Sequence, residues 1–168
     1  MSPENVEVVG DYLRAFVDGG IDAMVEFMDR DVDWRAMSQE NVEIVRRFYE
    51  GWNRRDLSGG LQDLHPDGEV DWSRSRGPEQ GVYRGVEAVE RFAQQWLDLF
   101  DEVRIEPKEF IDTGEYVVVP NVVTARGRDG IEVAARNTQV FTLRDGTIVR
   151  IRLYQERAEA LEAVGPRE

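Results

Sequence analysis

Apolar residues recur every three or four positions along two stretches of the chain, one that begins at Met37 and one over 85–100. This spacing is typical of an amphipathic helix that buries one face against a core. In the first stretch the apolar face consists of Val42, Val45, Phe48, Tyr49 and Trp52. In the second it consists of Val86, Val89, Phe92, Ala93, Trp96, Leu97 and Phe100. The pattern predicts two long helices that carry aromatic side chains into the interior.

Segments with strand character follow the second helix. They lie at 103–112, 116–126, 131–143 and 147–156, with short turns rich in Asp and Gly between them. A polar stretch before the second helix, 73–84, contains Gly and Pro and predicts a loop, and the end of the chain, ERAEALEAVG, predicts a short helix. Helices followed by a run of antiparallel strands are typical of an α+β fold, with the helices packed on one face of a curved sheet.

The opening of the chain is partly duplicated. Residues 1–9 read MSPENVEVV and residues 37–45 read MSQENVEIV, identical at seven of nine positions, and DVDW at 31–34 matches EVDW at 69–72. We interpret 1–36 as a partial copy of the opening helices and strand start, and 37–168 as the complete domain. The copy is expected either to pack where the second copy ordinarily would or to exchange onto a second subunit, with Arg35 and Ala36 as the hinge.

Strand alternation predicts which polar side chains face the core. In 131–143 one face is largely apolar and also carries Asn137 and Gln139, so both amides are expected in an apolar wall. In 147–156 the expected inward residues are Val149, Ile151, Leu153 and then Gln155. The outward residues there are Arg150, Arg152 and Tyr154. Strand 116–126 is apolar on both faces, and Pro120 in its middle suggests an edge or a bulge, which leaves the direction of Asn121 open.

Aromatic residues on the predicted buried faces suggest a pocket. Taken singly, each suits core packing, but together with the inward amides they would surround a flat, apolar ligand. The expected ligand-binding set is Phe48, Tyr49, Trp52, Trp72, Tyr83, Trp96, Asn137, Gln139 and Gln155, with Tyr83 at the mouth.

Three residues are the available candidates for acid–base or electrophilic catalysis: Asp71, Arg136 and His65. Alternation in EVDW places Val70 inward and sends Asp71 and Glu69 outward as solvated carboxylates, and Arg136 also has the outward phase. His65 precedes a proline turn in DLHPDG, which is typical of a surface or capping position. The expected inward set thus has no group that titrates near neutral pH, which favours binding over acid–base catalysis.

Composition and charge narrow the classes of partner. The 168 residues hold 34 Asp and Glu against 21 Lys and Arg, a net charge of −13, which argues against nucleic acid. Without Cys and with one His, no disulfide, metal site or cofactor is expected. No apolar run is long enough to span a bilayer and the first residues do not resemble a secretory signal, so a cytoplasmic protein without a membrane partner is expected.

Five segments in order, MSQENVEIVRRFYEGWNRRDL, EVDW, YRGVEAVERF, FTLRDGTIVRI and RAEALEAVG, resemble the SnoaL-like branch of the nuclear transport factor 2-like superfamily. The resemblance implies a cone-shaped α+β barrel, an apolar pocket between helices and sheet, and a homodimer formed through the sheet. Isomerase relatives carry a tyrosine, a general-base aspartate and a protonated aspartate where this chain has Phe48, Trp72 and Gln139.

Because this fold hosts many chemistries, three functions stay open. The preferred hypothesis is a protein that binds a small apolar molecule. The second is a cofactor-independent cyclase, isomerase or hydrolase in which Asp71, Arg136 or His65 reaches the pocket. The third is a non-catalytic dimerisation or interaction module with a filled core.

Overall fold

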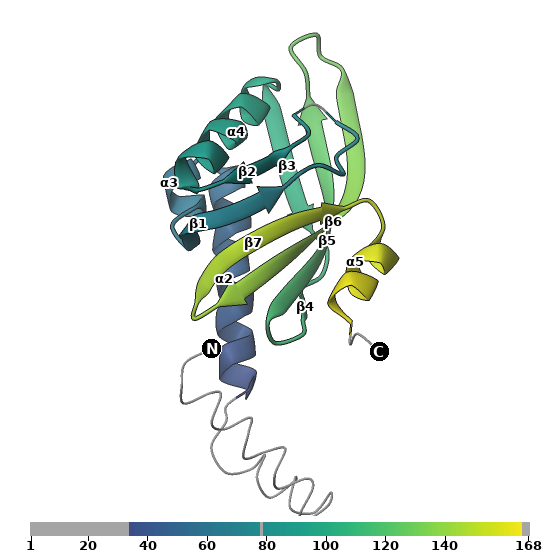
Figure 1. Ribbon diagram of the computed structural model, residues 1–168. Helices are drawn as coiled ribbons and strands as arrows, with labels where there is room; N and C mark the ends of the chain where they lie inside the picture. Colours follow the sequence, from purple (N-terminus) through teal and green to yellow (C-terminus); the bar gives the residue numbers. More distant parts are fainter. Residues whose placement is uncertain (1–33, 78, 166–168) are drawn as a thin grey trace, which may run out of the picture. The chain divides into compact units, whose positions relative to one another are not determined.

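The computed structural model describes residues 34–77 and 79–165 (Figure 1). The chain divides between Met37 and Ser38 into two units. The duplicated segment 1–36 lies almost entirely outside the described residues, so its packing or exchange stays a prediction. Helix α2 (Trp34–Asn53) begins before Met37. Arg35 and Ala36 therefore belong to a helix, and their role as a hinge stays a prediction.

The order of elements follows the α+β prediction, with helices first and a run of strands afterwards. After α2 the elements are α3 (Leu57–Gly60), β1 (Leu64–Asp71), β2 (Val82–Arg84), α4 (Val86–Asp98), β3 (Glu102–Pro107), β4 (Ile111–Asp112), β5 (Tyr116–Arg126), β6 (Glu132–Arg144), β7 (Thr147–Tyr154) and α5 (Arg157–Val164). Two predictions need correction. The segment 103–112 forms two strands, and the predicted loop 73–84 ends in β2, which pairs with β1.

The strands form one curved, mixed sheet in the order β2-β1-β7-β6-β5-β3, with β4 also paired to β5. Neighbours are antiparallel except β1 and β7, which run parallel. Strands β2 and β3 lie at the two ends of this order, so the sheet does not close on itself. The predicted α+β cone, a curved sheet packed on helices, is confirmed, and one parallel pair makes the sheet mixed where an antiparallel one was expected. Helices α2 and α4 lie against one face, and α5 lies near the other (Figure 1).

The main core lies between the helices and the concave face of the sheet. Helix α2 contributes a stripe that includes Phe48 and Tyr49, and α4 contributes a stripe that includes Phe92 and Leu97. Phe141 of β6 meets them from the sheet and is fully buried. Burial of each such side chain stabilises the fold by about 1.5 to 3 kcal/mol, so the two predicted helical stripes are the main reason these helices dock on the sheet.

The predicted inward residues of β6 are buried only in its second half, from Gln139 to Leu143, whereas Ile131, Val133 and Ala135 on the same face are exposed. The phase of β7 differs from the prediction at one position. Gln139 is buried beside Phe141 in β6. In β7, however, Leu143 pairs with Ile148 while Thr142 pairs with Arg150, which inserts Val149 as an extra residue. Ile148 is therefore the buried residue and Val149 is only half-buried, contrary to the prediction.

Pro120 does not bend or slip strand β5. The pairing of β5 with β6 is continuous through Pro120 and Thr138. The Pro120 carbonyl accepts a hydrogen bond from Lys108 N at 2.8 Å. Lys108 lies between the end of β3 and the start of β4, so the position where proline lacks an N–H faces an interruption between these two strands. Asn121 consequently shares the inward face with Val119 and is buried.

The other face of the sheet carries a second, smaller cluster. Val118, Val140 and Tyr154 pack there against Ala160 of α5. Tyr154 points outward as predicted, but α5 covers it, and it is only 3% exposed. Among the described residues, no helix combines the length and the apolar character needed to cross a membrane.

Candidate functional site

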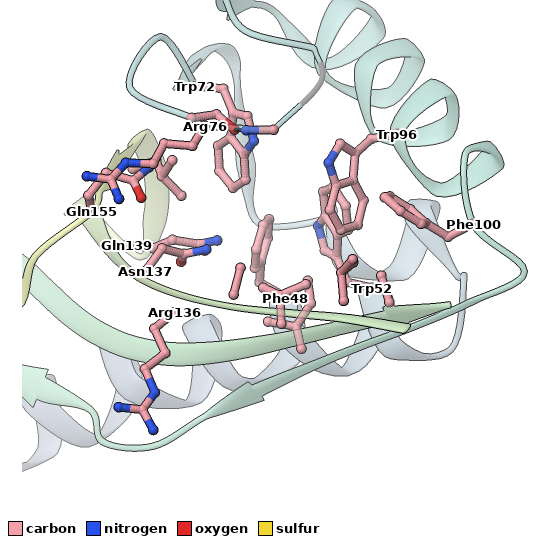
Figure 2. Close-up of a pocket in the computed structure, with 18 residues that line it drawn as sticks. Phe48, Trp52, Trp72, Arg76, Trp96, Phe100, Arg136, Asn137, Gln139 and Gln155 are labelled. Atoms are coloured by element: carbon pink, nitrogen blue, oxygen red, sulfur yellow. Dashed lines mark hydrogen bonds between the residues drawn. The ribbon is translucent and has the colours of Figure 1, made fainter. Parts of the chain in front are cut away.

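A cavity of ≈ 180 Å³ lies between the helices and the sheet (Figure 2). Aromatic rings form much of its wall. These rings belong to Phe48 and Trp52 of α2, to Trp72 directly after β1, and to Trp96 and Phe100 in and just after α4. Several of these rings touch one another edge-on or at a tilt, with 5.9 Å between the centroids of Trp52 and Trp96. The wall is thus a packed aromatic surface suited to an apolar ring.

The sheet provides the opposite side of the cavity. Its apolar contributions come from Ile105, Val123, Ala125, Val133, Ala135 and Leu153. The polar contributions are Asn137 and Gln139, whose amides lie side by side, and Gln155, which lies at the left of the close-up in Figure 2. Polar groups are therefore concentrated on one side of an otherwise apolar space, which is the usual composition of a small-molecule site.

A hydrogen-bonded network behind the wall holds Gln139. The Tyr49 hydroxyl donates to Gln139 Oε1 at 2.9 Å and accepts from Asn121 Nδ2 at 3.4 Å, and Asn121 Nδ2 also lies 3.3 Å from Val119 O. Burial raises the pKa of Tyr49 well above its ordinary value, although the Asn121 hydrogen bond lowers it in part. Tyr49 therefore stays a neutral donor, and the Gln139 oxygen is already occupied.

Two buried polar atoms of the cavity wall have no hydrogen-bond partner among the described residues, Trp52 Nε1 and Asn137 Oδ1. Buried polar groups are nearly always hydrogen-bonded, because an unpaired one costs about 1 to 3 kcal/mol. One atom is a donor and the other an acceptor. Both atoms are closed to a water-sized probe, so they lie behind the surface of the cavity.

Seven of the nine predicted ligand-binding residues line the cavity: Phe48, Trp52, Trp72, Trp96, Asn137, Gln139 and Gln155. Tyr49 lies behind the wall, where it holds Gln139. Tyr83 stacks on Phe92 instead, with 4.2 Å between ring centroids, and its hydroxyl donates to Glu79 O at 3.2 Å. Tyr83 is therefore not at the mouth, because the stacking partner on α4 turns its ring toward the helix.

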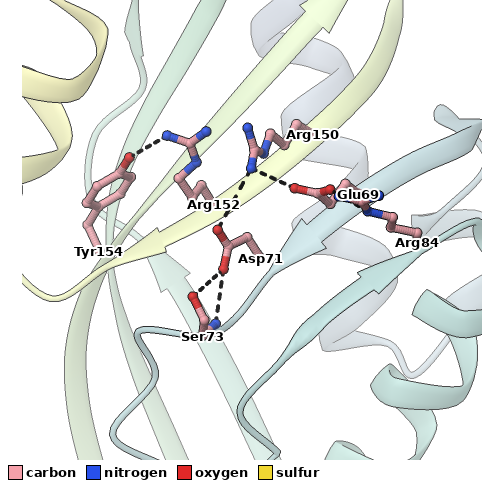
Figure 3. A network of polar contacts seen from close by, with 7 residues as sticks. All are labelled: Glu69, Asp71, Ser73, Arg84, Arg150, Arg152 and Tyr154. Atoms are coloured by element: carbon pink, nitrogen blue, oxygen red, sulfur yellow. Dashed lines mark hydrogen bonds and ion pairs between the residues drawn. The ribbon is translucent and has the colours of Figure 1, made fainter.

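Asp71 lies on the outward face of β1, in a network of ionic groups (Figure 3). Its Oδ1 accepts hydrogen bonds from Ser73 Oγ at 2.6 Å and Ser73 N at 3.1 Å. Burial acts to raise the pKa of Asp71, but the Ser73 hydrogen bonds and the charges of Arg150 and Arg152 outweigh it, so the pKa is lowered. Asp71 is an ionised structural group away from the cavity, and it does not line it.

The prediction that Glu69 and Asp71 are solvated needs correction. Their side chains are only 14% and 17% exposed. Glu69 forms ion pairs with Arg84 at 2.8 Å and Arg150 at 2.7 Å. Alternation gave the correct face, but arginines from β2 and β7 cover the carboxylates, and those contacts depend on strand pairing that local alternation does not reveal.

The other two catalytic candidates are also displaced from the cavity interior. His65 is exposed, and its Nδ1 accepts a hydrogen bond from Asp67 N at 3.1 Å, within the turn-like start of β1. Arg136 borders the cavity through its position on β6, but its side chain extends away (Figure 2). No group of three or more potential metal ligands of the His, Cys, Asp or Glu type occurs among residues 34–77 and 79–165.

The loop between β1 and β2 is part of the site, although no pattern in the sequence predicts it. Ser75, Arg76 and Gly77 line the cavity. The loop has no apolar periodicity, and its only signal was its position directly after Trp72. Contacts with distant β7 bring it to the site, since Gln155 Nε2 donates to Arg74 O at 2.6 Å.

An open α+β cone with an apolar cavity between its helices and its sheet defines a protein of the nuclear transport factor 2-like class. Within that class, the sequence matches the SnoaL-like domain family over residues 45–151, and the chain belongs to this family. None of the curated proteins matches the sequence significantly.

Solved structures of the same class resemble the chain over most of their length. TerC, co-crystallised with polyporic acid, is 25% identical with a TM-score of 0.63, over 73% of this chain and 96% of TerC. An NTF2-like protein of unknown function from Burkholderia pseudomallei is 27% identical with a TM-score of 0.63, over 76% and 98%. A putative polyketide cyclase from Xanthomonas campestris is 24% identical with a TM-score of 0.59, over 77% and 99%.

Proposed function

We propose that this protein binds a small, largely apolar molecule with one ring or two fused rings in the aromatic cavity. The observation that carries the proposal is a space of ≈ 180 Å³ with aromatic walls and amides on one side. A cavity of about 150 Å³ is large enough to hold benzene. The space is therefore of a size for one ring, and a larger ligand would extend through the mouth.

The polar atoms of the wall would orient the bound molecule. The relevant groups are the amides of Gln139 and Gln155, because both residues line the cavity. The Gln139 oxygen is held by Tyr49, which leaves its amide N–H groups for a ligand oxygen. A ligand with a carbonyl oxygen on an apolar skeleton would accept a hydrogen bond from the Gln139 amide. TerC, whose fold is similar, was crystallised with a small organic acid, polyporic acid, and this similarity supports the proposal.

The cavity wall favours binding over acid–base catalysis. Its described lining residues include no carboxylate, imidazole or tyrosine, and the charged ones are two arginines. Proton transfer from carbon requires a base near the substrate atom, and Trp72 lies where isomerase relatives carry that base. The open cavity also disfavours the third hypothesis, an interaction module with a filled core.

A cyclase-type activity is the second candidate. The observation that favours it is the Gln139 amide in the wall, whose N–H groups have no hydrogen-bond partner among the described residues, since such donors stabilise an oxygen on which negative charge develops. The substrate would then have to react without a base from the described wall. Incubation with polyketide-like aromatic diketones and analysis of the products by mass spectrometry tests this candidate, and a cyclised product formed at a catalytic rate would favour it over simple binding.

A ligand screen with a matched pair of variants tests the binding proposal. Ala135 lines the cavity from β6, whereas its neighbour Ala134 has the opposite phase, and both are exposed. Ala135→Trp is expected to fill the open side of the cavity, while Ala134→Trp adds the same indole outside it. We expect hydrophobic ketones and aromatics of one or two rings to raise the melting temperature of the wild type and of Ala134→Trp, but not of Ala135→Trp. Steroids, with four rings, are expected to have little effect.

Two results would contradict the proposal. The first is the absence of stabilisation by any apolar compound in the screen. The second is equal stabilisation of the two tryptophan variants, which would place the binding surface outside the cavity.

A further inference from the structure

The rim of the aromatic cavity is cationic although the chain as a whole is acidic. The net charge of the chain is −13. The described residues that line the cavity nevertheless include two arginines, Arg76 and Arg136, and no Asp or Glu. Random placement in a chain with 34 acidic and 21 basic residues would more often bring a carboxylate to this rim. The local charge is thus opposite in sign to that of the molecule.

Arg76 has no carboxylate partner in the part of the chain that the structure describes. Its neighbour on the same loop, Arg74, contacts Glu159 at 3.9 Å and lies 4.9 Å from the centroid of the Tyr154 ring, on the outer side of the sheet. Arg76 instead lies against the cavity, and its guanidinium extends toward Gln155 (Figure 2). Arg74 and Arg76 therefore extend to opposite sides of the loop.

The loop that presents Arg76 is held at several points. Trp72 N donates to Gly81 O at 2.7 Å and Ser75 N donates to Trp72 O at 3.0 Å, which closes the loop at its base. Gly77 N donates to Ser75 Oγ at 3.1 Å, directly beside Arg76. The Gln155 side chain ties the loop to the end of β7. Arg76 is consequently held at the mouth by the backbone, and little loop ordering would be needed to use it.

Arg136 has a different role. Its neighbours in sequence, Ala135 and Asn137, line the cavity, and alternation sends the Arg136 side chain to the other side of β6 (Figure 2). It adds positive charge near the rim but does not reach the mouth. Of the two arginines, Arg76 is therefore the group able to contact a ligand.

We infer that the ligand of this site is an apolar carboxylate, with its ring in the aromatic cavity and its anionic oxygens against Arg76 and the amide of Gln155. This inference rests on the proposed function, because it adds a charge to the molecule bound in the same cavity. A guanidinium matches a carboxylate with two parallel hydrogen bonds. Because Arg76 is exposed, water and salt screen this contact. An apolar amine or dication would be repelled at the same place.

Two probes of the same shape and different charge distinguish the proposed binding of an apolar molecule from the inference that the ligand is a carboxylate. The probes are 2-naphthoate and its neutral counterpart 2-naphthamide, titrated at neutral pH into the full-length protein by calorimetry. The wild type is expected to bind naphthoate about tenfold more tightly than naphthamide, and added salt is expected to reduce this preference.

Three variants assign the preference to Arg76. Arg76→Gln is expected to weaken naphthoate binding about tenfold and leave naphthamide binding unchanged, which removes the preference. Arg76→Lys keeps the charge and is expected to retain part of it. Arg74→Gln is the matched control on the same loop and is expected to bind both probes as the wild type does. Circular dichroism verifies that each exposed substitution leaves the fold intact.

The possible failures are distinct. If neither probe binds the wild type, the proposed function fails for two-ring aromatics and the inference falls with it. If both probes bind equally well, or if Arg76→Gln preserves the preference, the inference fails while the proposed function stands. If Arg76→Gln weakens both probes equally, Arg76 supports the loop and does not recognise the charge, which also overturns the inference.

Discussion

Buried polar residues in the wall of the cone are the most informative single positions in this protein. Asn121, Gln139 and Thr138 are each 2% exposed. Gln139 is held by a tyrosine hydroxyl from α2, so a helix and the sheet are joined by one buried hydrogen bond of 2.9 Å. Inside a protein, the removal of one partner of such a bond leaves the other partner buried without a hydrogen bond, and this costs more free energy than the intact bond contributes.

Removal of the Tyr49 hydroxyl is expected to destabilise the protein. Tyr49→Phe leaves the aromatic ring but deprives Gln139 Oε1 of its donor and Asn121 Nδ2 of an acceptor. We expect a loss of about 1 to 3 kcal/mol in the free energy of unfolding, measured by urea denaturation. Tyr83→Phe is the control, because its hydroxyl bonds an exposed carbonyl, and it is expected to cost less than about 0.5 kcal/mol. Equal losses for the two variants would contradict the role given to the buried network.

The same tyrosine predicts a change of stability at alkaline pH. Burial raises the pKa of Tyr49 well above the ordinary value of about 10. Above about pH 10 the unfolded chain loses this proton while the folded chain keeps it, so the contribution of Tyr49 to stability is complete below that pH and declines as pH rises. The difference in unfolding free energy between the wild type and Tyr49→Phe is therefore expected to shrink above pH 10. A difference that stays constant between neutral pH and pH 11 would be inconsistent with a buried neutral tyrosine.

At the scale of elements, the close approach of α2 and α3 sets the position of α2. A Cβ atom added at Gly51 would lie 2.3 Å from Gly60 Cα, which is far shorter than a real contact. A Cβ atom added at Gly60 would in turn lie 3.2 Å from Gly51 Cα. Two glycines face one another at this crossing because no side chain fits between the backbones. Since Phe48 and Trp52 lie on the same helix, this crossing also places part of the cavity wall.

Gly51→Ala is expected to destabilise the protein even though alanine is the better helix former. Helix propensity favours alanine by about 1 kcal/mol, but the backbone clash requires α2 and α3 to separate, and we expect a net loss of about 1 to 3 kcal/mol by urea denaturation. Gly127→Ala is the comparison, because its nearest neighbour is Ile131 O at 3.8 Å and its φ is not in the left-handed region. It is expected to be tolerated. A Gly51→Ala variant as stable as the wild type would show that the helices can move apart freely.

At the scale of the whole molecule, the main core draws its described members from between Ile44 and Ile151. The SnoaL-like match covers almost the same span, residues 45–151. This agreement predicts that the duplicated opening is not required for the complete domain to fold.

A chain shortened to begin at Trp34 keeps α2 whole and tests this prediction. We expect it to unfold within about 1 kcal/mol of the full-length protein. From the resemblance to dimeric relatives, both proteins are expected to sediment as homodimers, the full-length one at twice 19.3 kDa. If only the full-length protein is dimeric, residues 1–33 take part in the association, as an exchange between subunits would require.

The amino-acid sequence alone determined the features that depend on neighbours along the chain. The helical stripes, the order of helices and strands, and the inward phase of Asn137 and Gln139 all follow from a spacing of 3.6 or 2 residues, which is a local property. Of the seven predicted ligand-binding residues in the cavity wall, five lie on such regular faces, and Trp72 and Gln155 directly follow the strands β1 and β7.

Tertiary structure decided what depends on segments far apart in the sequence. The bulge at Val149 arises from the pairing of β6 with β7, and the arginines over Glu69 and Asp71 come from other strands. Tyr49 shares the helical face of the wall residues, yet its contact with Gln139, 90 positions away, withdraws it from the cavity. Arg76 lies on a loop that Gln155, 81 positions from its partner Arg74, ties to the end of β7. Periodicity records which face of an element is buried, whereas register and loop position are set by packing partners that no local pattern specifies.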